Sequence, residues 1–153
     1  MPDTNHPRIS EWVQYLARQI GKPDQDTFLV GHSMGCQAIL RHLGTTDGRI
    51  GGILLIAGFV SIRKGAITDG NDIEMMDPWV KTAIDWQKAR SNAGSSVLVL
   101  SDNDPYIDVS DADVFREKLG ARIIIIPNAG HFTAKDGYTE LHLALNGMLK
   151  MVK

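Results

Sequence analysis

Cysteine, net charge and long apolar runs are all scarce in this chain of 153 residues. The single cysteine, Cys36, excludes a disulfide within the chain and is typical of a reducing compartment, so we expect a cytoplasmic protein. A formal net charge of −2 provides no basic footprint for nucleic acid. No apolar run approaches the ~18 residues that a membrane span needs, and the polar segment 1–8 is unlike a signal peptide. The sequence therefore predicts a protein that binds neither nucleic acid nor membrane.

The rest of the composition is ordinary for a globular protein. The chain is 43% hydrophobic and 22% charged, and its length suits one domain spanning residues 1–153. Short apolar runs alternate with segments of helical periodicity. This alternation predicts an α/β fold, with a parallel sheet covered by helices on both faces. In such sheets, ligands bind beyond the carboxyl ends of the strands.

The expected elements follow from periodicity, capping residues and glycine stops. Strands are predicted for residues 27–30, 53–57, 97–100 and 122–126. Helices are predicted for residues 9–20, 36–43, 77–90, 110–120 and 138–152. Asp77 and Pro78 suit an N-cap and a first helical position, Ser110 and Asp113 resemble a capping box, and residues 61–76 show no clean period. The final helix is expected to bury one face made of Tyr138, Leu141, Leu145, Met148, Leu149 and Val152.

Residues 28–36 form the most informative segment of the sequence. An apolar run is followed by Gly31-His32-Ser33-Met34-Gly35 and then by a helical pattern, which is typical of a nucleophile elbow. In such a turn the serine is presented at the end of a strand, beside a helix N-terminus that favours developing negative charge. We expect the turn to be so tight that a side chain at position 31 or 35 would clash.

A serine hydroxyl needs an adjacent base to become a nucleophile, and the base needs a third group that fixes its tautomer. Ser33, Asp104 and His131 occur in the order typical of α/β-hydrolases, and each follows a predicted strand. All three are therefore expected at one rim of the sheet. Asp102 and Asp108 remain alternatives for the acid. Asp102 and Asp104 lack the further ligands and the glycine of a calcium loop, so we expect no metal, and no other cofactor is indicated.

Three motifs support a more specific interpretation: Gly31-His32-Ser33-Met34-Gly35, Ser101-Asp102-Asn103-Asp104-Pro105-Tyr106 and Gly130-His131-Phe132. Together they resemble a small α/β-hydrolase family of serine hydrolases, which includes the retinoblastoma-binding serine hydrolase of animals and short bacterial relatives. The resemblance covers essentially the whole chain. It implies that Ser33 is the nucleophile, Asp104 the acid and His131 the base. It also implies hydrolysis of small carboxylic esters or amides through an acyl-enzyme, with a small acyl compound as substrate.

The sequence differs from that family at its start. Members begin with a strand, a glycine-rich loop that supplies one oxyanion-hole donor, and a second strand, whereas this sequence begins at Met1-Pro2-Asp3. The resemblance therefore implies a chain without the first two strands, which we expect to be N-terminally shortened. The backbone N–H of Met34 is then the assignable oxyanion-hole donor. The strand at 27–30 would be an open apolar edge, prone to pairing with a second copy as a homodimer.

Aromatic residues near the motifs are candidates for a substrate pocket. Tyr106 and Phe132 adjoin the predicted acid and base, and either is expected to shape an acyl pocket. Trp79 and Trp86 are seven positions apart on one predicted helix. For Trp79, packing in the core and lining of the pocket both remain open.

The other histidines and the cysteine favour structural interpretations. His32, beside the serine, is expected to point away from it. His6, His42 and His142 fall on helix or terminal surfaces and are expected to be solvated. Cys36 follows the turn near a helix N-terminus, a position that can lower the pKa of a thiol, but we favour the role of a small buried apolar residue.

Two functions remain open from the sequence. The first is a serine hydrolase that acts on a small acyl substrate. The second is a non-catalytic module of the α/β-hydrolase fold, which binds a small molecule or a partner at the same rim and is inactive for lack of a complete oxyanion hole. Turnover of a simple ester by the folded protein distinguishes the two.

Overall fold

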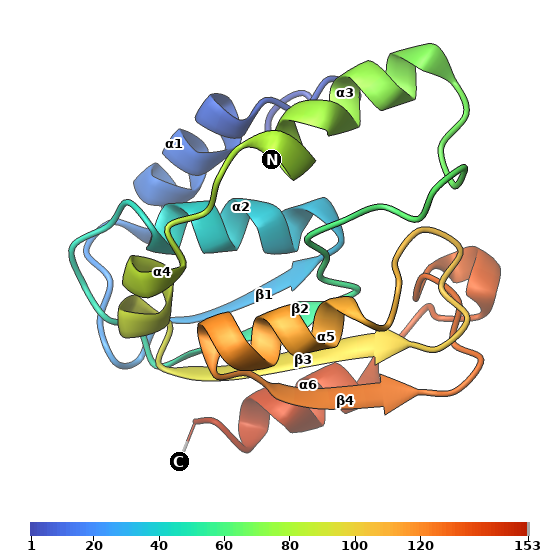
Figure 1. Cartoon of the computed structure of the whole chain (residues 1–153). Helices are drawn as coiled ribbons and strands as arrows, with labels where there is room; N and C mark the ends of the chain where they lie inside the picture. Colours follow the sequence, from blue (N-terminus) through green and yellow to red (C-terminus); the bar gives the residue numbers. More distant parts are fainter. Residues whose placement is uncertain (153) are drawn as a thin grey trace.

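The computed structural model describes residues 1–152, in which strands and helices alternate along the chain (Figure 1). The strands are β1 (Phe28–His32), β2 (Gly52–Ile56), β3 (Ser95–Ser101) and β4 (Arg122–Ile126). The helices are α1 (Ile9–Ile20), α2 (Met34–Leu43), α3 (Gly70–Lys81), α4 (Trp86–Asn92), α5 (Asp111–Val114) and α6 (His142–Leu149). A π-helical segment, η1 (Phe115–Leu119), continues α5, and a 3-10 turn, η2 (Ala134–Asp136), lies between β4 and α6. Within residues 1–152, no helix combines the length and the hydropathy that crossing a bilayer requires.

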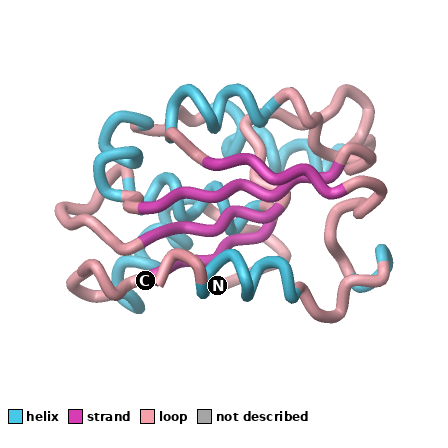
Figure 2. The backbone as a smooth tube through the Cα atoms, turned by 90° about the horizontal axis from the view of Figure 1, so that it is seen from below, coloured by secondary structure: helices cyan, strands magenta, loops and turns pink. Residues whose placement is uncertain are grey.

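The four strands lie side by side in one parallel sheet, in the order β1-β2-β3-β4 (Figure 2). In the register, Gly31 of β1 lies beside Leu55 of β2, which in turn lies beside Leu98 of β3. Leu98 pairs with Ile123 of β4. Because every strand points the same way, all four carboxyl ends meet at one edge of the sheet. The predicted α/β fold with a parallel sheet is confirmed.

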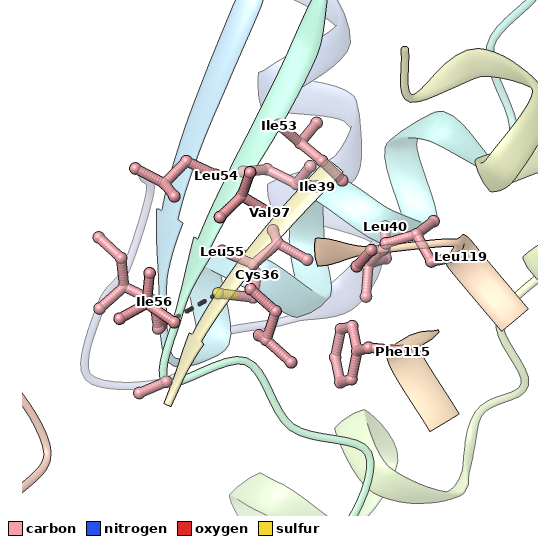
Figure 3. Packing of buried hydrophobic residues seen from close by; sticks show 14 of the residues in the cluster. Cys36, Ile39, Leu40, Ile53, Leu54, Leu55, Ile56, Val97, Phe115 and Leu119 are labelled. Atoms are coloured by element: carbon pink, nitrogen blue, oxygen red, sulfur yellow. Dashed lines mark hydrogen bonds between the residues drawn. The ribbon is translucent and has the colours of Figure 1, made fainter. Parts of the chain in front are cut away.

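Helices cover both faces of this sheet, as expected. Helices α2, α4 and α5 lie over one face, and α6 lies over the other (Figure 1). Every residue of β2 is buried between the two layers. Figure 3 shows Leu55 on the same side as Cys36 and Phe115, whereas Leu54 points the opposite way. Each such side chain contributes about 1.5–3 kcal/mol through burial, which makes β2 the centre of the core.

Strand β1 lies at one edge of the sheet and is only partly covered. Val30 is 52% exposed, and Phe28 and Leu29 are half-buried. An exposed apolar edge of this kind matches the expectation for the strand predicted at 27–30. The pairing of this edge with a second copy stays a prediction.

The helix predicted from Asp77 is wrong. Helix α3 begins seven residues earlier, at Gly70, where the Asp69 carboxylate caps it by accepting from the backbone N–H groups of Asn71 (2.9 Å) and Asp72 (3.4 Å). Pro78 lies inside this helix, which ends soon afterwards at Lys81. Proline lacks the N–H that would continue the ladder, so one backbone bond is lost close to the helix end, where the loss is tolerated. Trp86 begins a separate helix, α4.

The two last predicted helices are also corrected in detail. Ser110 makes no side-chain capping bond, so the capping box predicted there does not form. Helix α6 spans His142–Leu149 rather than 138–152. Its predicted buried face is divided, because Leu145, Leu149 and Val152 are more than half exposed, whereas Tyr138, Leu141 and Met148 pack against the core.

Candidate active site

Ser33 lies between β1 and α2 in a strained backbone conformation. Its φ of 51° and ψ of −119° fall outside the regions that non-glycine residues commonly adopt. The turn is held by a hydrogen bond from the Ser33 N–H to the Ile56 carbonyl (2.9 Å) and by one from the Cys36 N–H to the Ser33 carbonyl (2.9 Å). Strain of this kind costs about 1–3 kcal/mol and persists only where the surrounding structure imposes it. Here the core of β2 and the first turn of α2 impose it.

Gly31 is required by close packing at this turn. A Cβ at position 31 would lie 2.9 Å from the backbone N of Cys36 and 2.9 Å from the carbonyl C of Gly35, which no real Cβ tolerates. The same expectation for Gly35 is wrong. A Cβ there would meet nothing within 4 Å outside the neighbouring turns of its own helix. The two glycines of the motif therefore differ in their structural roles.

His131 and Asp104 form a buried hydrogen-bonded pair at the same edge of the sheet. His131 Nδ1 lies 2.8 Å from Asp104 Oδ2, and their side chains are 12% and 1% exposed. The other carboxylate oxygen accepts from the backbone N–H groups of Tyr106 (2.8 Å) and Ile107 (3.2 Å). Because the carboxylate oxygen accepts, the neutral imidazole carries its proton on Nδ1, and in that tautomer Nε2 has a free lone pair. Among the described residues, His131 and Ser33 make no direct hydrogen bond, but both line one cavity.

The last residue of β3 and the loop after it hold the segment that leads to His131. Asp102 accepts from the Asn128 N–H (2.8 Å), and Asn103 accepts from the Gly130 N–H (2.7 Å). The Ser101 hydroxyl accepts from the Ala129 N–H (2.9 Å). Three consecutive side chains thus satisfy three consecutive backbone donors, which fixes one loop against the other.

These contacts separate Asp104 from the two alternatives for the acid. Asp102 is engaged with the backbone at position 128, and Asp108 accepts from the Ser110 N–H (2.9 Å) and lies 3.6 Å from Arg63. Only Asp104, of these three aspartates, contacts His131.

The Asp136 carboxylate also holds the backbone around His131. The His131 N–H donates to Asp136 (3.1 Å), which also accepts from the N–H of Thr133 (2.9 Å) and from its hydroxyl (2.6 Å). Hydrogen bonds from Thr133 hold the pKa of Asp136 below its ordinary value. Gly130 has a φ of 57°, and a side chain there would collide with the Asp136 carboxylate. Glycine is thus needed where the chain turns into His131.

His32 connects the turn at Ser33 to the same loop. Its Nε2 lies 2.8 Å from the backbone carbonyl of His131, and the two rings are 4.9 Å apart between centroids. Since a carbonyl only accepts, Nε2 of His32 carries a proton and donates it. Burial is the main cause that lowers the pKa of His32. His32 was expected to point away from Ser33 and to have a structural role, and its contact with the backbone of the histidine loop is a role of that kind.

A cavity of about 220 Å³ opens beside Ser33 and His131. Its remaining walls come from α3 and the segment between β2 and α3, from the first residue of α2, and from the loop after β3. The apolar lining residues are Met34, Ile62, Ile67, Met75, Met76 and Ile107, joined by Tyr106 and Asp72. This volume lies below the ~300–1,000 Å³ of typical small-molecule pockets, so it suits a small ligand.

Of the three aromatic residues predicted to line a pocket, Tyr106 lines this cavity. The centroid of its ring lies 5.0 Å from that of the His131 ring. Phe132 and Trp79 do not line it. Phe132 is buried against Tyr138, with 5.4 Å between ring centroids. Trp79 packs edge-on against Trp12 (5.4 Å) and donates from its ring N–H to the Pro7 carbonyl (3.0 Å). Trp79 therefore anchors α3.

Cys36 and His42 are both buried. Burial raises the pKa of the Cys36 thiol to about 12, and its Sγ lies 3.3 Å from the Ile56 carbonyl (Figure 3). Its role as a small buried residue is the one that the structure favours. His42 is 2% exposed rather than solvated as expected, and neither ring nitrogen has a hydrogen-bond partner among the described residues. In residues 1–152, no three His, Cys, Asp or Glu side chains are arranged to hold a metal ion.

The comparisons with known proteins agree on one family. The family model described as "Serine hydrolase" matches residues 1–148. The chain belongs to the serine hydrolase family.

Relatives of this family member align over most of its length. YdeN of Bacillus subtilis is 30% identical over 143 residues, which cover 92% of this chain and 72% of that protein. Serine hydrolase RBBP9 of Rattus norvegicus is 23% identical over 149 residues, or 97% of this chain and 75% of that protein. The crystal structure of the ydeN gene product superposes with a TM-score of 0.86 at 27% identity and covers 99% of this chain and 78% of that one.

More distant structures support the fold alone. A structure from work on carboxylesterases of Nitrososphaera gargenis has a TM-score of 0.65 at 12% identity, over 99% of this chain and 75% of that one. The chain is thus a hydrolase-family member with the α/β-hydrolase architecture.

Sequence reasoning missed most residues that line the cavity. Ile62, Ile67, Met75 and Met76 come from a segment that lacks helical or strand periodicity over much of its length. Asp72, in the first turn of α3, was missed with them. The Asp69 cap was the available signal, since an aspartate before a helix can satisfy its first backbone donors.

Proposed function

We propose that this chain hydrolyses small carboxylic esters or amides through an acyl-enzyme intermediate. Ser33 Oγ attacks the carbonyl carbon and gives its proton to His131 Nε2. The attack converts the substrate carbonyl into a tetrahedral intermediate bound to Ser33. His131 then gives the proton to the leaving alcohol or amine as the bond to the acyl group breaks. Water, activated by the same histidine, attacks the acyl-enzyme and regenerates Ser33. Every proton taken up by His131 is returned in the same half-reaction.

The observation that carries this proposal is the 2.8 Å contact between His131 Nδ1 and Asp104, with Ser33 and His131 on the wall of one cavity. The buried carboxylate favours the tautomer that leaves Nε2 free and stabilises the imidazolium that forms during proton transfer. The Met34 N–H, at the first position of α2, is the proposed oxyanion donor, because first-turn N–H groups have no partner within their own helix. The cavity volume of about 220 Å³ favours a small acyl group.

Covalent labelling tests the nucleophile. A fluorophosphonate probe should label Ser33, and the Ser33→Ala variant should remain folded and unlabelled. Hydrolysis of p-nitrophenyl butyrate should disappear in the same variant. A folded protein that takes no label and turns over no ester would contradict the proposal and favour a binding module with the same fold.

Two aspartates in one loop provide a matched test of the acid. Asp104→Asn keeps an oxygen that can accept from the backbone but places an NH₂ group opposite His131 Nδ1, or reverses that arrangement. We expect kcat to fall on the order of 10⁴-fold. Asp102→Asn also keeps an acceptor for the Asn128 N–H but does not touch His131, so its kcat should change far less. Equal losses in both variants would contradict the assignment.

A further inference from the structure

The cavity beside Ser33 combines an apolar wall with one negative charge. Among the described residues that line it, Asp72 is the one carboxylate, and none is lysine or arginine. The six apolar side chains named above form the rest of the wall with Tyr106 and the reacting residues. A ligand here meets a mostly apolar surface with an anionic group at one place.

The Asp72 carboxylate is not used to hold α3 together. The cap of this helix is the Asp69 side chain, and Asp72 takes part through its backbone N–H alone. Within residues 1–152, the Asp72 carboxylate forms no ion pair and no side-chain hydrogen bond. By contrast Asp77, on the same helix, is paired with Lys81. Asp72 is exposed, so its carboxylate lies at the open side of the cavity with its hydrogen-bonding capacity available for a ligand.

The volume of the cavity limits the size of the group that it can hold. Its volume of about 220 Å³ corresponds to roughly seven water molecules at ~30 Å³ each. An acyl chain of about six carbons with a polar end is on this scale. An ammonium group at that end would gain a charged hydrogen bond to Asp72, whereas a carboxylate would be repelled.

We propose that the site prefers short acyl groups that carry an ammonium group over neutral or carboxylate-bearing acyl groups of equal length. This inference rests on the proposed function, since it names the acyl substrates of the same site. Asp72 recognises the cation, and the apolar wall holds the methylene chain. The preference is a matter of specificity, so Asp72 acts on the acyl group rather than on the reacting atoms.

Three methyl esters of matched length test this preference: methyl hexanoate, the methyl ester of ω-aminohexanoate, and monomethyl adipate. Hydrolysis is followed by proton release in a pH-stat, and kcat/KM is compared. We expect the aminohexanoate ester to exceed the neutral ester about two- to fivefold, as for a solvent-exposed ion pair. Repulsion of the adipate ester widens the ratio between the two charged esters to about four- to twenty-fivefold. Added salt should reduce both ratios.

Substitutions on α3 assign the preference to Asp72. Asp72→Asn should make the three esters nearly equivalent, and Asp72→Lys should favour the adipate ester. Glu74→Gln is the matched control, because it removes an exposed charge from the same helix without lining this cavity. Ester preferences that Asp72→Asn leaves unchanged, or that Glu74→Gln alters equally, would overturn the proposal.

A binding measurement separates this proposal from the proposed function. On the Ser33→Ala variant, calorimetry compares hexylammonium with hexanol, neither of which can react. Tighter binding of hexylammonium that disappears in the Ser33→Ala, Asp72→Asn double variant supports cation recognition even if no ester is turned over. Equal binding of the two ligands overturns it even if Ser33 is labelled and neutral esters are cleaved.

Discussion

Replacement of Gly31 by alanine should destabilise the protein by about 1–3 kcal/mol, the cost of forcing an extra methyl group into a packed interior. The added Cβ would lie 2.8 Å from Ile39 Cδ1 and 2.9 Å from backbone atoms of Gly35 and Cys36. The Ile39 methyl group can rotate away from the contact. The backbone atoms belong to the first turn of α2 and can move only if the turn at Ser33 moves with them. We therefore expect a loss of ester hydrolysis along with the loss of stability.

Gly35→Ala is the matched control, because it makes the same chemical change in the same motif. Its Cβ would meet nothing within 4 Å outside the adjacent turns of α2. Alanine is favoured over glycine in a helix by about 0.8–1 kcal/mol, so this variant should be as stable as the parent or more stable.

Urea denaturation, followed by circular dichroism and by tryptophan fluorescence, measures both unfolding free energies, provided that the two transitions coincide. The expected outcome is a lower unfolding free energy for Gly31→Ala and an unchanged or higher one for Gly35→Ala. A Gly31→Ala variant as stable as the parent, or equal changes in unfolding free energy in both variants, would refute the close packing at the turn between β1 and α2.

Three further predictions concern single side chains. Cys36, whose pKa is raised to about 12 by burial, should resist iodoacetamide in the native protein near pH ~8 and react on unfolding; rapid alkylation of the native protein would show that the thiol is accessible. Burial lowers the pKa of His42, so the neutral form is favoured in the native state, and the unfolding free energy should decline as pH falls below the ordinary histidine pKa of about 6.5. His42→Leu should flatten that decline between pH ~7 and ~5, and an unchanged slope would assign the pH dependence to other groups. His32→Phe should lower kcat/KM about two- to tenfold by removing the hydrogen bond to the His131 loop, and His32→Gln should recover part of the loss; equal activity of the two variants would mean that the donor has no positioning role.

The sheet and its central residues could be predicted from the sequence because their signals are local. Strand β2 is a continuous apolar run, and β3 contains one at residues 97–100, which is typical of strands covered on both faces. The Gly-x-Ser-x-Gly motif predicts a strand-to-helix turn, and the structure places Ser33 in one. Sequence order and strand ends were enough to suggest that Asp104 and His131 would lie near each other.

The corrected elements lacked a comparable signal. Helix α3 buries Trp79 alone among its side chains, so its apolar residues form no continuous stripe that periodicity could detect. Asp77 and Pro78 then offered a stronger local start signal than Asp69. Asp77-Pro78 marks the start of a helix only if no helix already spans these residues. Whether one does depends on contacts with residues far away in the sequence.

Tertiary contacts decide where α3 lies, and through α3 they decide the shape of the cavity. Trp79 is held by Trp12 and by the Pro7 carbonyl, while Arg41 of α2 donates to the carbonyls of Trp79 (2.9 Å) and Thr82 (2.7 Å) at the end of α3. The partners of Trp79 are far from it in the sequence, so no local pattern could reveal them. The reacting residues, by contrast, follow strands whose register the core fixes. In the proposed function, reactivity and substrate preference therefore depend on different parts of the fold. A change in the contacts of α3 would alter which acyl group is accepted while leaving the geometry of His131 and Asp104 in place.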